Sequence, residues 1–159
     1  MSKQIKHLQT LFNNPFVLGH VLYSFYKSLN VEHPQGIDKS VLLSYLVFPL
    51  SLYPASQEYL TQRRHPSSCL RIMAKEHNRL FGLHERIQEF RTMTNISMQH
   101  ACDLEVLSVN PEQAVMVLSD WPDAFIALPH ACKAAQRLGE FMSKQDIPSS
   151  YRMLGVRAL

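Results

Sequence analysis

Apolar residues recur at helical spacing along most of the chain, and the first clear helical pattern follows Asn14-Pro15. An asparagine side chain can accept a hydrogen bond from the free N–H groups that open a helix. Proline fits the first helical position because its missing N–H is not needed there. Phe16, Val21 and Phe25 then belong to a broad apolar face. The pattern predicts a helix that begins at Pro15 and packs one face into a core.

Residues 41–53 are apolar almost all round, so we expect them to form a helix at the buried centre of the fold. Asp38 can cap this helix at its N-terminus. Pro49 lies within it, removes one backbone hydrogen bond and presses against the carbonyl of Tyr45, so the helix should kink or end there. A buried strand is the alternative, because periodicity alone does not distinguish the two in a short apolar run.

The middle of the chain predicts three short helices and then two strands. The helices are expected at residues 69–80, 83–93 and 95–107, the first of them opened by Ser67-Ser68. The period then changes at residues 104–110 and 114–120, which are rich in valine and flank a tight turn. A long helix is expected over residues 124–143, and the tail after it has a short helical segment at its centre.

This order of elements predicts a mainly α fold with a small β-hairpin. Residues 1–62 form an N-terminal helical segment, residues 63–122 a winged-helix-like segment, and residues 123–159 a C-terminal helix with a docking tail. Three short helices followed by a hairpin is the order of a winged helix-turn-helix, which would put residues 95–107 in the recognition position and make the hairpin the wing. The three segments are expected to form one compact domain.

Composition changes this picture little. The chain has 159 residues, a net charge of +3 with histidines neutral, and only five glycines, and its hydrophobic content is that of an ordinary globular protein. Its three cysteines, Cys69, Cys102 and Cys132, form no CxxC pair and are typical of a reduced cytoplasmic protein. The longest uncharged run, residues 40–57, contains four serines and two prolines, so it is too polar to span a bilayer. No membrane contact is therefore expected.

The triplet His-Ala-Cys occurs twice, at residues 100–102 and 130–132, which raises the question of a metal site. Both copies lie in predicted helices, where positions two apart point to nearly opposite sides, so neither triplet can bind one ion through both side chains. The sequence also has no paired zinc motif, glycine-rich phosphate loop, GxSxG or HExxH. We therefore expect no metal, no cofactor and no enzyme activity. Cys102 and Cys132 should be small core residues, with the histidines near the surface.

Basic residues are concentrated between Arg63 and Arg91, where seven lysines and arginines stand against three acids. Such a concentration on helices suits contact with phosphates or with an acidic protein, and a solvated helix face is the plainer alternative. The predicted recognition helix contains no lysine or arginine, which argues against base reading in the major groove. The candidate docking residues are Arg63, Arg64, Arg71, Lys75 and Arg79.

Two short motifs near the C-terminus stand out: Leu138-Gly139 with Phe141 close by, and the terminal Leu154-Gly155-Val156-Arg157. They follow the Asn14-Pro15 helix start, the apolar run of residues 46–52 and the step Glu85-Arg86-Ile87. In this order, and over this length of chain, the motifs resemble those of the small middle components of bacterial ABC-three-component systems. The chain departs from that pattern at Ala158-Leu159, where a proline often follows the arginine, and in the divergent residues 95–103.

The resemblance implies a non-catalytic adaptor. Middle components accompany an SMC- or Rad50-like ATPase subunit and an effector subunit, often a nuclease, in cytoplasmic defence against phage or plasmids. The Lamassu type is the best-known example, and such a complex would bring the adaptor to double-stranded DNA. The candidate partner interface is the tail of Met153, Leu154, Gly155, Val156 and Arg157, packed either on the ATPase or on the chain's own helices. The alternative function is a winged-helix DNA-binding transcriptional regulator, which should form homodimers and bind a palindrome.

Overall fold

The computed structural model describes residues 13–29, 40–62, 68–122 and 126–157. The predicted cap Asp38, the basic residues Arg63 and Arg64, and Ser67 lie outside the described residues. The elements in chain order are α2 (Pro15–Ser28), η1 (Val41–Leu43), α3 (Ser44–Ser51), α4 (Pro54–Thr61), α5 (Leu70–Lys75), α6 (His77–Leu80), α7 (Leu83–Asp103), β1 (Leu107–Val109), β2 (Val115–Val117), α8 (Pro129–Met142) and α9 (Ile147–Met153). The fold is mainly helical with one antiparallel hairpin, as predicted.

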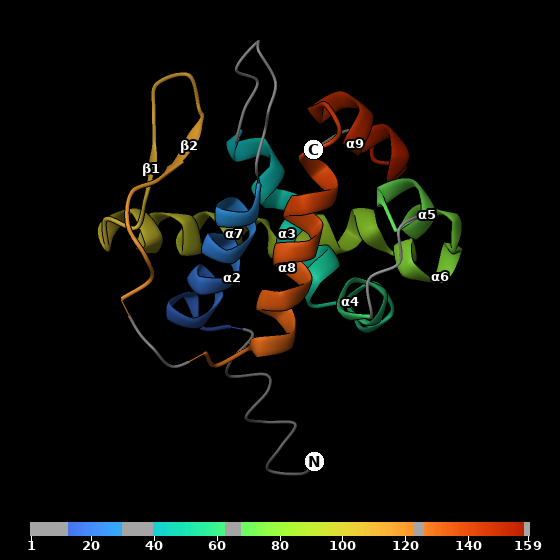
Figure 1. Ribbon diagram of the computed structural model, residues 1–159, viewed down its shortest axis with the longest axis horizontal. Coiled ribbons are helices and arrows are strands. Elements are labelled where there is room, and N and C mark those ends of the chain that lie inside the picture. The colour runs from blue at the N-terminus through green and yellow to red at the C-terminus, as the bar shows by residue number, and fades with distance from the viewer. Residues whose placement is uncertain (1–12, 30–39, 63–67, 123–125, 158–159) are drawn as a thin grey trace.

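Helix α2 begins where the sequence predicts. The Asn14 side chain accepts a hydrogen bond of 3.0 Å from the backbone N–H of Phe16, and Pro15 occupies the first helical turn. Most of the helix is buried, since α8 lies along one side of it and α7 crosses behind both (Figure 1). Helix α2 is therefore the centre of the core.

Helix α8 packs along α2 through small residues, among them Ala131, Ala135 and Gly139. A methyl group on Gly139 would lie 2.6 Å from the backbone oxygen of Phe25 in α2, so the two helices approach as closely as their backbones allow. The helix is shorter than the predicted 124–143. Residues 126–128 are not helical, and α8 begins at Pro129. Proline suits this position because the first turn of a helix does not need its missing N–H.

The apolar run of residues 41–53 is helical and mostly buried, as predicted, but it is divided into η1 and α3. Pro49 does not stop α3 at once. The helix continues to Ser51, because proline removes only its own N–H, and the N–H of Leu52 still bonds to the carbonyl of Phe48 at 3.0 Å. The next helix, α4, begins at Pro54.

Two predictions for the middle of the chain are wrong. The expected helix at residues 69–80 is broken at Glu76, whose backbone is extended, into α5 and α6. The expected helices at residues 83–93 and 95–107 are instead the single helix α7. Thr94 and Ser97 have low helix propensity, but Ile87, Met98 and Ala101 on either side of them are buried in the core, and this apolar packing carries the helix through the expected break. A separate recognition helix is therefore missing among the described residues, and the winged-helix arrangement is not confirmed.

The hairpin forms where predicted, although each strand is only three residues long. Leu107 pairs with Val117 and Val109 with Val115. The Asn110 side chain accepts a hydrogen bond of 2.8 Å from the N–H of Ala114 and so closes the turn. Leu107 and Val115 are buried, so each strand packs one side chain into the core.

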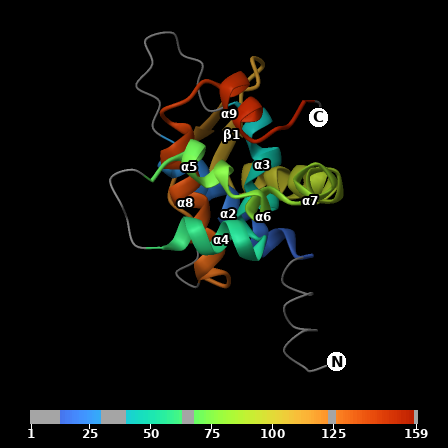
Figure 2. The same cartoon turned by 90° about the vertical axis from the view of Figure 1, so that its right-hand side faces the viewer.

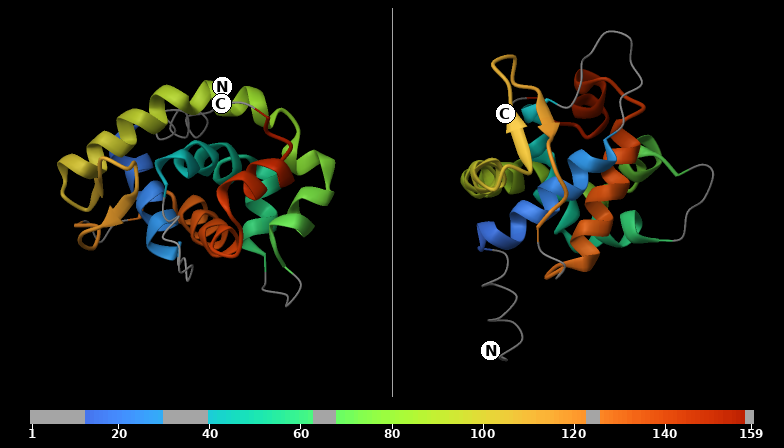
Figure 3. Two further views of the ribbon diagram at one scale, coloured as in Figure 1. Left: turned by 90° about the horizontal axis from the view of Figure 1, so that it is seen from above. Right: turned by 60° about the vertical axis from the view of Figure 1, so that its left-hand side comes forward.

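Figure 2 shows α7 end-on beside α3. Seen from above, α7 runs along one side of the molecule, with the hairpin close to one end and α5 and α6 at the other (Figure 3). One cluster of buried apolar side chains includes residues from all three predicted segments. Within the described part of the chain, no helix is long and apolar enough to cross a membrane.

Candidate interaction surface

Helix α7 forms the floor of a cavity of about 470 Å³ that opens beside the hairpin. The floor consists of Asn95, Met98, Gln99 and Cys102, which lie on one helix face because they are spaced three or four residues apart. The remaining lining residues come from η1, the start of α3, and the hairpin with its flanks: Val41, Ser44, Glu105, Leu107, Ser108, Val109 and Leu118. Helix α7, the hairpin that follows it and the distant segment of η1 and α3 thus line one hollow.

A smaller hollow of about 140 Å³ lies further towards the start of α7 and is lined by Leu42, Tyr45, Ile87, Gln88 and Arg91. The two hollows adjoin, because the hydroxyl of Tyr45 in the second donates a hydrogen bond of 2.8 Å to Asn95 Oδ1 in the first. We call the two together the α7 groove. Residues 87–102 of its floor span roughly 22 Å at 1.5 Å per residue.

Large apolar side chains are exposed around this groove. Leu118 is 54% exposed and Leu42 is 40% exposed, and both line it. Other exposed apolar residues belong to the same three elements or their flanks: Ile96, Leu104, Val109 and Met116. A concentration of apolar surface on neighbouring elements is typical of a site for protein contact. The sequence did not reveal this surface. The predicted break in α7 placed Ile87 and Arg91 in one helix and Met98 and Cys102 in another, although all four line one groove.

The basic stretch does not form one free cationic surface. Arg79 donates hydrogen bonds to the carbonyls of Ile72 and Met73 at 3.4 and 3.3 Å, and its guanidinium lies 4.2 Å from the ring centre of Tyr59. Only Arg71 and Lys75 of the described docking candidates are exposed. The structure therefore keeps two candidates accessible and uses the third inside the fold.

Arg86, from the step Glu85-Arg86-Ile87, also has a structural role. Its guanidinium lies 3.6 Å from the ring centre of Tyr53, and it donates to the carbonyl of Pro49 at 3.1 Å and to that of Phe81. Burial lowers the pKa of Arg86 from its ordinary value. The side chain ties α7 to the end of α3.

The C-terminal tail packs on the chain itself. Leu154 and Val156 are buried, Met153 is half-buried, and Gly155 and Arg157 are exposed. Gly155 has a left-handed φ of 72°, and its N–H bonds to Arg152 while the N–H of Val156 bonds to Tyr151, both at 3.0 Å. This is the Schellman stop that glycine favours. The two apolar residues of the motif are therefore not available to a partner in the folded chain.

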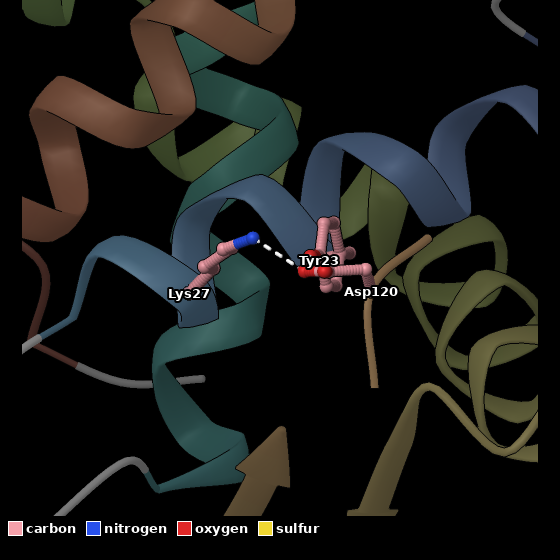
Figure 4. Close-up of polar contacts among 3 residues, drawn as sticks. All are labelled: Tyr23, Lys27 and Asp120. Atoms are coloured by element: carbon pink, nitrogen blue, oxygen red, sulfur yellow. Dashed lines mark hydrogen bonds and ion pairs between the residues drawn. The ribbon is translucent and has the colours of Figure 1, made fainter. Parts of the chain in front are cut away.

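A polar contact joins α2 to the segment after β2. Asp120 accepts a hydrogen bond of 2.9 Å from the hydroxyl of Tyr23 and one of 2.5 Å from Lys27 (Figure 4). The bond from Lys27 lowers the pKa of Asp120, and the same bond raises the pKa of Lys27. Beside it, Trp121 stacks on His20 with ring centres 5.0 Å apart. These contacts fix the chain where it leaves the hairpin.

The two His-Ala-Cys triplets lie apart and in different environments. His100 packs edge-on against Phe16 at 4.2 Å, whereas Cys102 lines the α7 groove and is half-buried rather than part of the core. His130 is exposed and Cys132 is buried, as expected. Burial raises the pKa of both thiols. Among residues 13–29, 40–62, 68–122 and 126–157, no group of three or more His, Cys, Asp or Glu could hold a metal ion.

Comparison with known proteins gives one match. The family model described as "ABC-three component (ABC-3C) system Middle Component 3" matches residues 2–158. No curated protein matches, and neither does any solved structure.

Proposed function

Because the chain belongs to the Middle Component 3 family of ABC-three-component systems, we propose that it is the non-catalytic adaptor of such a system. In this proposal it joins an SMC- or Rad50-like ATPase to a nuclease effector, in a cytoplasmic defence complex of the Lamassu type directed against phage or plasmids. A middle component of a multi-component system has protein partners, and the ATPase and the effector are the two proposed here.

The observation that carries the proposal is the apolar surface around the α7 groove. Leu42, Val109 and Leu118 are exposed although each is large and apolar, and they line neighbouring hollows. Exposed apolar surface of this kind is stabilised when a protein partner covers it. An adaptor needs such a surface and needs no reactive group.

The cysteines support a non-catalytic role. A thiol acts as a nucleophile in its thiolate form, and burial raises the pKa of Cys102 and Cys132. Both side chains are therefore poor nucleophiles near neutral pH. Their positions, one in a groove wall and one in the core, suit packing.

Contact with double-stranded DNA is proposed through the complex rather than through this subunit alone. Arg79 is bonded within the fold, so Arg71 and Lys75 are the exposed cations left among the described docking candidates. Two phosphate contacts give only weak binding, because the electrostatic contribution grows with the number of phosphates neutralised. The ATPase or the effector would have to supply further contacts.

Reconstitution tests the adaptor function. The three subunits of the system are co-expressed with an affinity tag on the ATPase, and the purified material is analysed by size-exclusion chromatography with light scattering. We expect the effector to co-purify with the ATPase only when this chain is present. Equal recovery of the effector without the chain would refute bridging. A homodimer of the isolated chain that binds a palindromic DNA would instead support a transcriptional regulator.

A further inference from the structure

Resting on the adaptor function, we propose that the α7 groove binds one amphipathic α-helix of a partner subunit, which runs antiparallel to α7. The helix inserts apolar side chains into the two hollows and places its N-terminal end near Glu105 and its C-terminal end near Arg91.

The shape of the groove favours an elongated occupant. Its floor follows α7 from Ile87 to Cys102, and its two hollows adjoin across the bond between Tyr45 and Asn95. An α-helix is about 10–12 Å across, so the hollows are too small to enclose one. They hold side chains instead, while the helix itself lies along the rim for roughly four turns, about 22 Å.

The walls favour a helix over an added strand. A strand must pair its backbone with a free sheet edge along its whole length. Here the only strand of the lining is β1, which is three residues long and lies at one end. The remaining helical walls are η1, α3 and α7. Their backbone groups already have partners, since the N–H of Val41 bonds to the carbonyl of Gln113 at 2.9 Å and α3 and α7 make their bonds within helices. A helical occupant satisfies its own backbone and needs only apolar side chains.

Charge at the two ends sets the direction. Arg91 lines the hollow near the start of α7, and Glu105 lines the other hollow just beyond its end. The middle of the groove has the apolar side chains of Leu42, Val41 and Met98. A helix carries partial positive charge at its N-terminus and partial negative charge at its C-terminus. Complementarity therefore directs its N-terminus towards Glu105 and its C-terminus towards Arg91, antiparallel to α7.

The first experiment measures binding of the full chain to the co-purified ATPase and effector subunits. Leu118→Asp and Leu42→Lys place a charge in each hollow and should each weaken binding at least tenfold. Glu105 lines the hollow of Leu118 and Arg91 lines that of Leu42, so each new charge would be buried beside a like charge and without a partner. Phe81→Asp is the matched control, since Phe81 is 65% exposed but lies outside the groove, and its binding should be unchanged. Thermal unfolding of each variant confirms that the fold is retained.

The second experiment identifies the occupant. A photo-crosslinking amino acid is placed at position 118 or at position 42, and the crosslinked peptides from the three-subunit complex are sequenced. Both positions should capture one partner segment with apolar residues at helical spacing. The residue captured from position 118 should precede the residue captured from position 42 by two to four turns, on the order of 7–15 residues.

The outcomes separate the inference from the function on which it rests. If the wild-type chain does not bind its partners, the adaptor function fails. If it binds them but the Leu118→Asp and Leu42→Lys variants bind equally well and neither position crosslinks, the groove is not the docking surface. Capture of an extended segment, of a second copy of this chain, or of one helix in the reverse order would overturn the proposed occupant or its direction.

Discussion

The backbone of Gly139 faces the carbonyl oxygen of Phe25 at the closest approach of α8 and α2. A Cβ atom at Gly139 would come within 2.6 Å of that oxygen and within 3.2 Å of the backbone nitrogen of Leu29. Both neighbours are main-chain atoms of a buried helix, so they cannot rotate away. The glycine of the Leu138-Gly139 motif is therefore required by helix packing.

Replacement of Gly139 by alanine should destabilise the protein by about 1–3 kcal/mol, because the added methyl group forces the two helices apart. In an exposed helix the same change would stabilise by about 1 kcal/mol. Chemical denaturation measures the difference. Gln136→Ala, at an exposed position of the same helix, is the control and should have little effect. Equal stability of Gly139→Ala and the wild type would contradict the close approach.

Replacement of Glu105 by glycine should stabilise the protein by about 0.5–1 kcal/mol. Glu105 ends α7 with a left-handed φ of 57°, and its N–H bonds to the carbonyl of Cys102 at 2.9 Å, as in a glycine helix stop. Glycine adopts this conformation without the steric cost that glutamate bears. Glu112→Gly is the control, because Glu112 has no positive φ, and it should be neutral or destabilising. A rise in melting temperature for Glu105→Gly alone is the expected result.

The apolar residues of the tail motif, Leu154 and Val156, should stabilise the fold and should not contact a partner. Leu154→Ala should cost about 2–5 kcal/mol, because Leu154 is 3% exposed and its loss leaves a cavity. Arg157→Ala, at an exposed position, should change stability by less than about 0.5 kcal/mol. Urea unfolding of both variants decides between the roles. A stable Leu154→Ala protein that no longer binds its partners would show that the tail docks on the partner instead.

Arg86→Ala should destabilise the fold by about 1–3 kcal/mol, because the carbonyls of Pro49 and Phe81 lose their donor and Tyr53 loses its packing partner. Arg71→Ala is the matched control on the same basic stretch, since Arg71 is exposed. Its effect on stability should be close to zero. If the two substitutions cost the same, Arg86 does not hold α7 to α3.

The contact between Lys27 and Asp120 should make stability depend on pH in the acid range. Because the pKa of Asp120 is lowered in the folded chain, its contribution is present above the ordinary aspartate pKa of about 3.9 and is lost as the pH falls through the lower folded value. Asp120→Asn should therefore melt below the wild type at pH 7, and the two melting temperatures should converge as the pH falls below the ordinary aspartate pKa. Salt at about 1 M should narrow the difference at pH 7, since both side chains are exposed. A difference that does not shrink as the pH falls would point to another cause.

A few adjacent residues were enough to predict a helix start, a hairpin and a helix stop. Asn14-Pro15 predicted the start of α2, the valines around Asn110 predicted the hairpin, and Gly155 predicted a helix stop. Each depends on a few adjacent residues whose conformational preferences agree with the fold. Both glycines of the C-terminal motifs that carried the family resemblance are needed by the backbone. Gly139 allows the close approach of α8 to α2, and Gly155 adopts a left-handed φ.

Features that depend on distant contacts could not be predicted. Thr94 and Ser97 have low helix propensity, so the sequence indicated a break, and the burial of Ile87, Met98 and Ala101 on either side of them explains the continuous helix. The α7 groove joins residues near positions 42, 98 and 118, which no short pattern relates. The bond from Tyr23 to Asp120 likewise spans 97 positions.

The continuity of α7 also has a mechanical consequence. A helix of 21 residues is a rod roughly 31 Å long at 1.5 Å per residue. Helices α5 and α6 lie at one end of this rod, and the hairpin lies close to the other (Figure 3). Two proteins bound at these ends would be held at a set spacing and would turn together, because the rod has no hinge between them. Two shorter helices joined by a turn would instead have left each free to swing.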